Sequence, residues 1–98
     1  MKVVVPVSER RGEESPISKI EKAQAFAFLT LADGMSIEAI EFKERFENDF
    51  FDYIVVSDKN EEIEMAYDLG ARVLLARPGM EIGQIVEAMM FKELDEIV

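Results

Sequence analysis

The sequence predicts an α/β fold built on a five-stranded mixed sheet, with the N-terminal strand at the centre of that sheet. Residues 2–8, Lys-Val-Val-Val-Pro-Val-Ser, contain a run of valines that lacks the polar alternation of a half-exposed strand. The dipeptide Asp33-Gly34 separates two strand-like runs and indicates a hairpin. Residues 53–98 alternate strand-like and helix-like segments, which is typical of parallel strands joined by helices. With 98 residues, we expect a single domain spanning residues 1–98.

The first strand is expected to end close to Pro6, because proline has no backbone N–H and is best tolerated at a strand end. Residues 9–14 are charged and contain Gly12, so they are predicted to form a loop. Pro16 keeps Ser15 out of a helix and extends that loop. Ligands of α/β sheets bind at the carboxyl ends of the strands, so this loop is the natural place for a site.

Residues 19–42 are predicted to contain a helical turn and both arms of the hairpin. The turn falls within residues 19–24, and a strand follows over residues 25–31 with Phe26 and Phe28 on one face. The Asp-Gly dipeptide suits a two-residue turn with positive φ at both positions. The return strand is expected over residues 36–42, as an edge strand whose glutamates face solvent.

The stretch from Lys43 to Asp52 is charged and contains Phe46 and Phe50, which are four residues apart. This spacing predicts a short helix that lays both aromatic rings on the core. Residues 53–56, Tyr-Ile-Val-Val, then form a buried strand of the parallel type.

Two further helices are predicted in the last third of the chain. Asp58 or Asn60 caps the first, Glu61 and Glu62 fall in its first turn, where the helix dipole favours acids, and Gly70 ends it. A strand over residues 72–76 and a turn at Arg77-Pro78-Gly79 follow. The helical spacing rests on Ile63, Ala66 and Tyr67 in the first helix and on Ile82, Ile85, Val86 and Met89 in the second.

The predicted order is strand, strand, strand, short helix, strand, helix, strand, helix. Right-handed crossovers place the strand at residues 53–56 beside the first strand and the strand at residues 72–76 outside it. The hairpin then pairs with the opposite side of the first strand, which gives the five-stranded sheet.

Composition limits the function more than any motif does. The net charge is −10, so duplex nucleic acid and anionic membrane surfaces would be repelled. The chain has no cysteine and no histidine, which removes thiolate and imidazole ligands and the commonest general base. Because these side chains and a Gly-rich phosphate loop are missing, we expect a protein that is not an enzyme. We see no signal peptide and no apolar run long enough for a membrane span, so a cytoplasmic protein is expected.

Two enzyme-like alternatives start from Asp58, which follows a buried strand. A phosphoacceptor receiver domain would also need an acidic pair after the first strand, where Ser8-Glu9 stands instead. A magnesium-dependent nuclease could use Glu9 with Asp58, but the first strand itself carries no acid and the net charge opposes the substrate. We therefore expect no catalytic residues and no metal ligands.

Several strings resemble the dinitrogenase iron–molybdenum cofactor biosynthesis family of the NifX type. The opening Met-Lys-Val-Val-Val-Pro-Val-Ser and the Ser-Pro-Ile-Ser at residues 15–18 are similar to that family's start. Phe26-Ala27-Phe28, residues 53–56 with residues 67–73, and a closing helix from Ile82 to Leu94 extend the likeness over nearly the whole chain. The resemblance implies a ribonuclease-H-like fold.

The resemblance also implies where a cofactor would bind. The family's loop position falls on Ser8, Ser15, Ser18, Lys19 and Lys22, with Arg10 nearby. A histidine that the family carries after Ser-Pro-x-Ser falls here on Lys19 or Ile20, and neither side chain ligates a metal at neutral pH. An anionic cluster would therefore be held by hydrogen bonds and charge.

Two hypotheses of function remain. The first is a small carrier or accessory factor in the biosynthesis of iron–sulfur or iron–molybdenum cofactors, as the resemblance implies. The second is a cofactor-free protein-interaction or regulatory module on the same scaffold. The last helix and its tail carry Met89, Met90, Phe91 and Leu94, so we expect either a protein partner or self-association there, or a tail that folds back to cover them.

Overall fold

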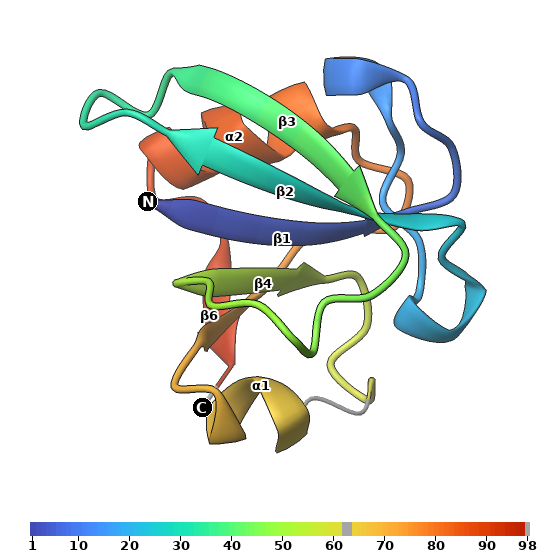
Figure 1. Cartoon of the computed structure of the whole chain (residues 1–98). Coiled ribbons are helices and arrows are strands. Elements are labelled where there is room, and N and C mark those ends of the chain that lie inside the picture. The colour runs from blue at the N-terminus through green and yellow to red at the C-terminus, as the bar shows by residue number, and fades with distance from the viewer. Residues whose placement is uncertain (62–63, 98) are drawn as a thin grey trace.

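The structure is a computed structural model that describes residues 1–61 and 64–97, together with all side chains in these ranges except that of Met65. Six strands of the described residues form one mixed sheet in the order β3-β2-β1-β4-β5-β6 (Figure 1). The elements are β1 (Lys2–Val7), η1 (Gly12–Glu14), η2 (Ile20–Lys22), β2 (Ala25–Leu31), β3 (Ile37–Lys43), β4 (Tyr53–Val56), α1 (Glu64–Asp68), β5 (Arg72–Leu75), α2 (Ile82–Met90) and β6 (Asp95–Ile97). Neither α-helix is long and apolar enough to cross a bilayer, as far as these residues show.

The N-terminal strand lies inside the sheet, as the valine run predicts. β1 pairs antiparallel with β2 along its whole length, from Lys2 opposite Thr30 to Val7 opposite Ala25. On its other side it runs parallel to β4, and β5 follows outside β4. The hairpin on one flank and the parallel strands on the other are both confirmed.

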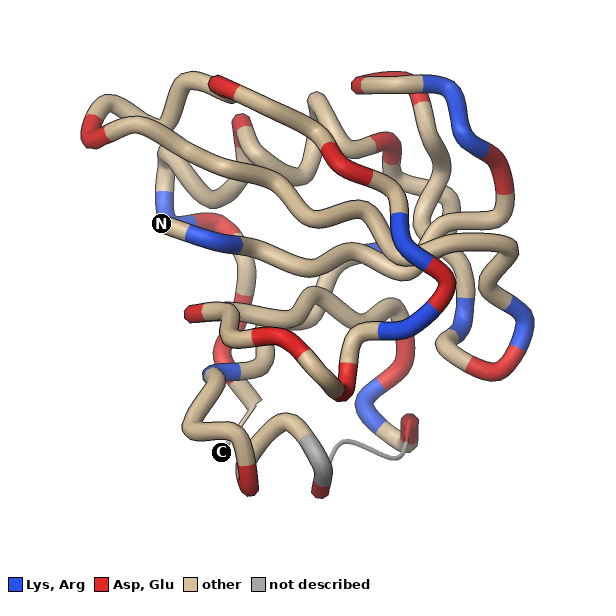
Figure 2. Tube along the Cα trace, viewed as in Figure 1, with Lys and Arg blue, Asp and Glu red and all other residues tan. Residues whose placement is uncertain are grey.

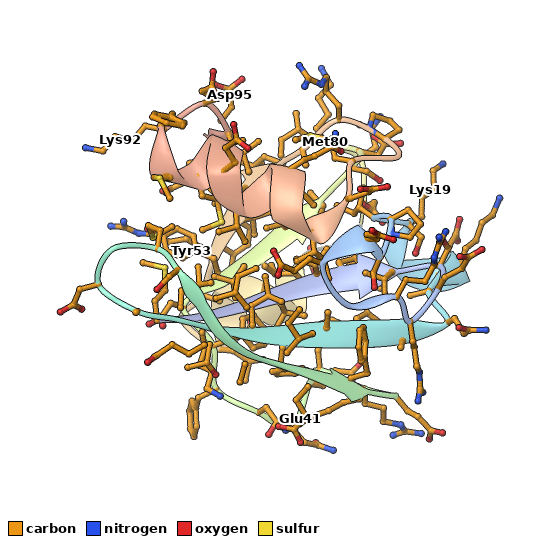
Figure 3. All side chains as sticks on the ribbon, turned by 90° about the horizontal axis from the view of Figure 1, so that it is seen from above. Lys19, Glu41, Tyr53, Met80, Lys92 and Asp95 are labelled. Atoms are coloured by element: carbon orange, nitrogen blue, oxygen red, sulfur yellow. The ribbon has the colours of Figure 1, made fainter. Side chains whose placement is uncertain are left out.

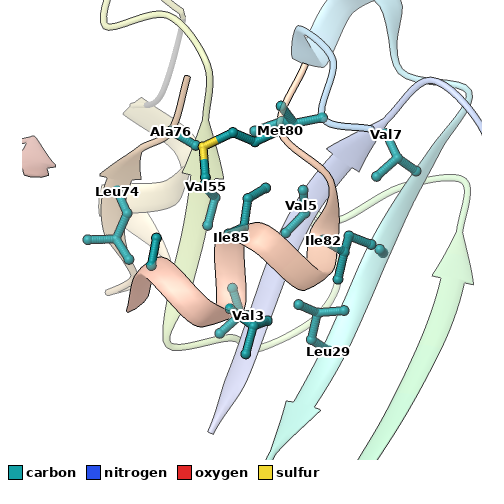
Figure 4. Close-up of a cluster of buried hydrophobic side chains, with 14 of the residues drawn as sticks. Val3, Val5, Val7, Leu29, Val55, Leu74, Ala76, Met80, Ile82 and Ile85 are labelled. Carbon is teal, nitrogen blue, oxygen red and sulfur yellow. The ribbon is translucent and has the colours of Figure 1, made fainter. Parts of the chain in front are cut away.

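Alternate valines of β1 enter two different cores, which explains why the run has no polar positions. Val3, Val5 and Val7 face α2, while Val4 packs with Ile54 on the opposite face of the sheet. Figure 4 shows α2 lying across β1, with Ile85 close to Val5. The other face is covered by α1 and by the segment that connects β3 with β4.

The sixth strand corrects the predicted count of five. The predicted closing helix over Ile82–Leu94 is too long, because α2 ends at Met90 and Lys92 turns the chain with φ +56°. Asp95–Ile97 then pairs antiparallel with β5 and covers its open edge. Three residues, of which two are acidic, carry no strand pattern, so only the need to pair the β5 edge defines β6.

The predicted short helix between Lys43 and Asp52 is also wrong, since the chain there is irregular. Phe46 is buried as predicted, but the second buried ring belongs to Phe51, and Phe50 is 88% exposed. The rings of Phe46 and Phe51 have centroids 6.0 Å apart, and Phe46 lies 5.0 Å from Phe26 of β2. The segment folds over the sheet to bury these two rings, which are five residues apart and could not share a helix face.

The hairpin is present, but its turn differs from the prediction. Neither Asp33 nor Gly34 has a positive φ, whereas Met35 does, at +68°. The Met35 amide donates to the carbonyl of Ala32 at 2.8 Å, so the loop has three residues and ends in a left-handed one. The return strand begins at Ile37 rather than at Ser36, and its pairing with β2 shifts register once, between Thr30 and Leu31.

Three other local predictions concern turns and helix ends. The helical turn within residues 19–24 is η2, and Gly70 ends α1 with φ +77°, so both are confirmed. Glu62 and Ile63, which are predicted to belong to the same helix, lie outside the described residues.

Candidate functional site

The candidate site lies at the carboxyl edge of the sheet, where β1 and β4 separate. These strands pair only at Val3–Tyr53 and Val4–Ile54. Beyond that point the Ser-Pro-Ile-Ser loop takes the free side of β1: the Ser18 amide donates to the Pro6 carbonyl at 2.9 Å, and the Ser8 amide donates to the Pro16 carbonyl at 3.1 Å. Pro6 has no backbone N–H, and it is tolerated near the strand end because the loop on this side bonds only to the Pro6 carbonyl.

The same loop is tied to the beginning of α2. The Ile17 amide donates to the Met80 carbonyl at 2.8 Å, and the Ile82 amide donates to the Ser15 carbonyl at 3.0 Å. Ile17 is buried in the core beneath α2. The loop is therefore an ordered part of the edge, held between the end of β1 and the start of a helix.

Ser15 holds the loop together from inside. Its side chain is fully buried, and its hydroxyl oxygen accepts a hydrogen bond from the Arg11 amide at 2.7 Å. Ser15 can therefore contribute to a ligand site by shaping the loop. Ser8, in contrast, lies exposed at the end of β1.

Ser18, Lys19 and Lys22 lie along the outer side of the loop. The Ser18 hydroxyl donates to the Lys19 carbonyl at 3.1 Å, and the Lys19 ammonium lies 3.8 Å from Asp58 of the β4–α1 connection. Lys22, at the end of η2, is exposed. Figure 3 shows Lys19 at the end of the molecule opposite to Tyr53, which begins β4. The structure thus places the predicted residues at one edge, with Ser15 beneath the others.

Basic residues follow the strands that end at this edge, but acidic residues are interleaved with them (Figure 2). Arg11 lies 3.4 Å from Glu9 and 3.8 Å from Glu14. The loops after β1, β4 and β5 and the η2 turn carry six basic residues: Arg10, Arg11, Lys19, Lys22, Lys59 and Arg77. The edge therefore offers separate cationic groups rather than a continuous positive surface.

Two hollows meet at Lys19. One has a volume of about 450 Å³ and is lined by the apolar side chains of Ile17, Leu75 and Pro78 together with Ser18 and other polar residues. The other has a volume of about 710 Å³ and is mostly acidic; its lining includes Glu21, Glu47, Asp58, Glu61, Glu64 and Asp68. An anion is disfavoured in the acidic hollow, so the smaller one is the better place for an anionic ligand.

Glu61 is the residue of this site that the sequence did not reveal. It was assigned to the first turn of a helix, but α1 spans Glu64–Asp68. Its carboxylate accepts hydrogen bonds from the Ile20 amide at 2.6 Å and from the Ser57 amide at 3.2 Å. The first of these joins residues 41 positions apart in the sequence, so no local pattern could have indicated it.

The donor set does not suit direct binding of a metal cluster. Iron–sulfur clusters are held by thiolates or imidazoles, and the chain has neither cysteine nor histidine. In the part of the chain that the structure describes, no three or more acidic side chains are placed to hold a metal ion. What the edge offers is lysine ammonium groups, serine hydroxyls and backbone amides, which suit the outer atoms of an anion.

The opposite edge carries one perturbed group. The Tyr53 hydroxyl accepts from Arg72 at 3.5 Å, and Glu96 lies 3.9 Å from the same guanidinium. The hydrogen bond with Tyr53 first, and the charge of Glu96 second, raise the pKa of Arg72. Arginine is a cation at physiological pH in any case, so the shift changes no protonation state; the contacts of Arg72 link exposed side chains of β4, β5 and β6.

Among known proteins, this chain is similar to several solved structures. No family model matches the sequence, and no curated protein matches it. The crystal structure of PH0822 is similar with a TM-score of 0.76 and 21% identity, and the match covers 97% of this chain and 95% of that one.

Two other solved structures are similar to nearly the whole of this chain. A proposed dinitrogenase (MJ0327) from Methanocaldococcus jannaschii has a TM-score of 0.73 and 17% identity over 99% of this chain and 94% of its own. A proposed NifB protein (TM1290) from Thermotoga, of the DUF35 family, has a TM-score of 0.69 and 16% identity over 97% and 91%. At these identities the likeness establishes a shared α/β fold.

Proposed function

We propose that this chain is a NifX-like accessory protein of metallocofactor biosynthesis, with a ribonuclease-H-like fold. Its cargo would be an anionic iron–sulfur or iron–molybdenum cluster at the carboxyl edge of the sheet. The protein would act in the cytoplasm as a carrier and not as an enzyme. The observation that carries the proposal is the ordered Ser15–Ser18 loop, which holds Lys19 at the open ends of β1 and β4.

The chemistry of the edge decides how such a cargo would be held. Without thiolate or imidazole ligands, the protein would contact the outer groups of the anionic cluster through Ser18, Lys19, Lys22 and nearby backbone amides. Binding of this kind is weaker than direct ligation and depends on salt, because the cationic groups are exposed. Such reversible binding is suited to a carrier, because a carrier must release its cargo.

Two structural neighbours support this proposal. One is a proposed dinitrogenase and the other a proposed NifB protein, and each is matched over nearly the whole of this chain. The opening strand and the Ser-Pro-Ile-Ser loop add the likeness of sequence to NifX-type proteins.

Anaerobic incubation with a synthetic [4Fe–4S] cluster or with isolated iron–molybdenum cofactor, followed by gel filtration, tests the proposal. We expect the cluster's visible absorbance to elute with the protein at low salt and to separate from it at high salt. The double variant Lys19→Met/Lys22→Met, with the same fold, should carry less. If wild-type protein elutes colourless at low salt, the carrier function is wrong for this chain.

The second candidate is a cofactor-free interaction module, and the end of α2 favours it. Met90 is 46% exposed and Phe91 is 65% exposed at this end. Exposed methionine and phenylalanine side by side suit a protein contact, either with a partner or with a second copy of the chain. Light scattering after gel filtration would detect self-association, which Phe91→Ser should abolish; a monomer at all concentrations would exclude the second copy.

A further inference from the structure

We propose that Glu61 is a positioning residue that fixes the Lys19–Lys22 turn on the carboxyl edge and thereby sets the affinity of that edge for anions. This inference rests on the proposed function, because it concerns the same edge. It adds a residue, and a direction of effect, that neither the sequence likeness nor the structural neighbours supply.

The geometry makes Glu61 a clamp between two segments. One carboxylate oxygen accepts the Ile20 amide at 2.6 Å, at the start of the η2 turn. The other accepts the Ser57 amide at 3.2 Å, directly after β4. Hydrogen bonds from amides to an ionised carboxylate are about twice as strong as neutral ones. The turn that carries the two lysines is thus bound to the end of a core strand.

This contact matters because the other long-range hydrogen bonds that the structure describes next to the turn go to β1. The Ser18 amide before the turn donates to the Pro6 carbonyl, and the Gln24 amide after it donates to the Val7 carbonyl, both at 2.9 Å. Ile20 is half-buried, and no residue of η2 is fully buried. Without Glu61, the turn would stay tied to β1 at its two ends and would lose its hydrogen bond to the segment after β4, so Lys19 would be less fixed relative to β4.

Asp58 provides a matched comparison on the same connection, three residues before Glu61. It also bears one negative charge near the site, but one of its carboxylate oxygens lies 3.8 Å from the Lys19 ammonium itself, while the other accepts the Asn60 amide at 2.9 Å. An anionic ligand must compete with Asp58 for that ammonium. Asp58 therefore opposes anion binding, whereas Glu61 supports it through the backbone.

The two roles predict effects of opposite sign for the same change in charge. Asp58→Asn and Glu61→Ala each remove one negative charge from the edge, and Asp58→Asn keeps an acceptor for the Asn60 amide. If only long-range electrostatics mattered, both variants would bind an anion more tightly. If Glu61 positions the turn, Glu61→Ala binds more weakly although a negative charge has gone.

The test is a titration of the full chain with tetrathiomolybdate, a dianionic metal sulfide that absorbs in the visible range. We expect Asp58→Asn to raise the affinity about twofold to fivefold, since an exposed ion pair is weak. Glu61→Ala should lower it about tenfold, which is the loss typical of removing a group that orients a binding residue. Glu61→Gln keeps one acceptor oxygen and should fall between Glu61→Ala and wild type.

Amide NMR spectra separate positioning from loss of the fold. In Glu61→Ala the Ile20 and Ser57 resonances should shift and exchange faster with solvent, while those of β1 and β2 stay in place. Higher affinity in both Asp58→Asn and Glu61→Ala, or unchanged affinity in Glu61→Ala with a displaced Ile20 resonance, would overturn the inference. If neither wild type nor any variant binds the probe, the result counts against the proposed function. In that case, unshifted Ile20 and Ser57 resonances in Glu61→Ala would also overturn the positioning role of Glu61.

Discussion

Lys92 holds the same backbone position at the end of α2 that Gly70 holds at the end of α1. Both residues have a left-handed conformation, with φ +56° at Lys92 and +77° at Gly70. Each donates to the carbonyl three residues back, at 3.1 and 2.9 Å, and the following residue donates to the carbonyl five residues back, at 2.8 and 2.9 Å. Both helices therefore end in a Schellman motif, and only one of them has the residue that this motif prefers.

The mismatch at Lys92 predicts a stabilising substitution. A side chain in the left-handed region costs roughly 1 kcal/mol relative to glycine, so Lys92→Gly should raise the free energy of unfolding by about 0.5–1 kcal/mol. The reverse change, Gly70→Ala, should lower it by about 1 kcal/mol, because an added Cβ at Gly70 meets no atom within 4 Å and only the backbone is strained. Urea denaturation followed by circular dichroism measures both changes.

Gly34 is the control for these glycine effects. Its φ is not in the left-handed region, and a Cβ there would also meet no atom within 4 Å. Gly34→Ala should therefore leave stability unchanged or raise it slightly. A loss as large as that of Gly70→Ala would show that the conformational argument is mistaken.

Phe50 and Phe51 are neighbours in sequence and predict very different losses of stability. Phe51 is 7% exposed and packs against Phe46 and Phe28, so Phe51→Ala should cost about 3 kcal/mol. Phe50 is 88% exposed, so Phe50→Ala should change the free energy of unfolding by less than about 0.5 kcal/mol. Equal losses in chemical denaturation would mean that the β3–β4 connection folds differently.

The hydroxyl of Ser15 predicts a structural effect within the candidate site. Ser15→Ala leaves the Arg11 amide without its acceptor and should cost about 1–2 kcal/mol. Ser8 is exposed, so Ser8→Ala should stay within about 0.5 kcal/mol of wild type. Thermal unfolding of the two variants measures the difference between Ser15, which stabilises the loop, and Ser8, which is exposed and accessible to a ligand. Similar losses of stability in both variants would contradict this distinction.

The position of Lys19 predicts how cargo binding depends on charge. Lys19→Met should weaken binding of an anionic cluster several-fold at low salt and reduce the slope of affinity against salt concentration. Lys92→Met removes the same charge after the C-terminal end of α2, far from Lys19 in Figure 3, and should have little effect. Titrations at two salt concentrations check this, and equal weakening by both variants would point to net charge rather than to a site.

The correct predictions share one property, which is that the signal is local. The valines of residues 3–5 indicate a strand buried on both faces, and Gly70 indicates a helix end, because each pattern depends on neighbours along the chain. The Asp33-Gly34 dipeptide located the hairpin but not its turn type, since Met35 accepts the left-handed position instead. In this left-handed conformation, Met35 packs against the core under α2.

The incorrect predictions each depended on a distant partner. The segment from Lys43 to Asp52 has helical spacing of two phenylalanines, but the ring of Phe51 finds the aromatic cluster on β2 and the helix does not form. β6 forms because it pairs with the otherwise open edge of β5, and nothing in the sequence of β6 itself indicates a strand. Glu61 reaches an amide 41 residues away, so its role in the site is a product of the fold.

The sequence by itself determined the class of fold, the interior place of the first strand and the absence of the side chains that ligate metal clusters. Periodicity, glycine and proline positions and composition are read along the chain, and these features depend on nothing else. Only the tertiary structure decided which side chains meet at the carboxyl edge, because the contacts that build it join segments separated by tens of residues. Burial and backbone hydrogen bonding, rather than any local motif, bring Ile17, Lys19 and Glu61 to one end of the sheet.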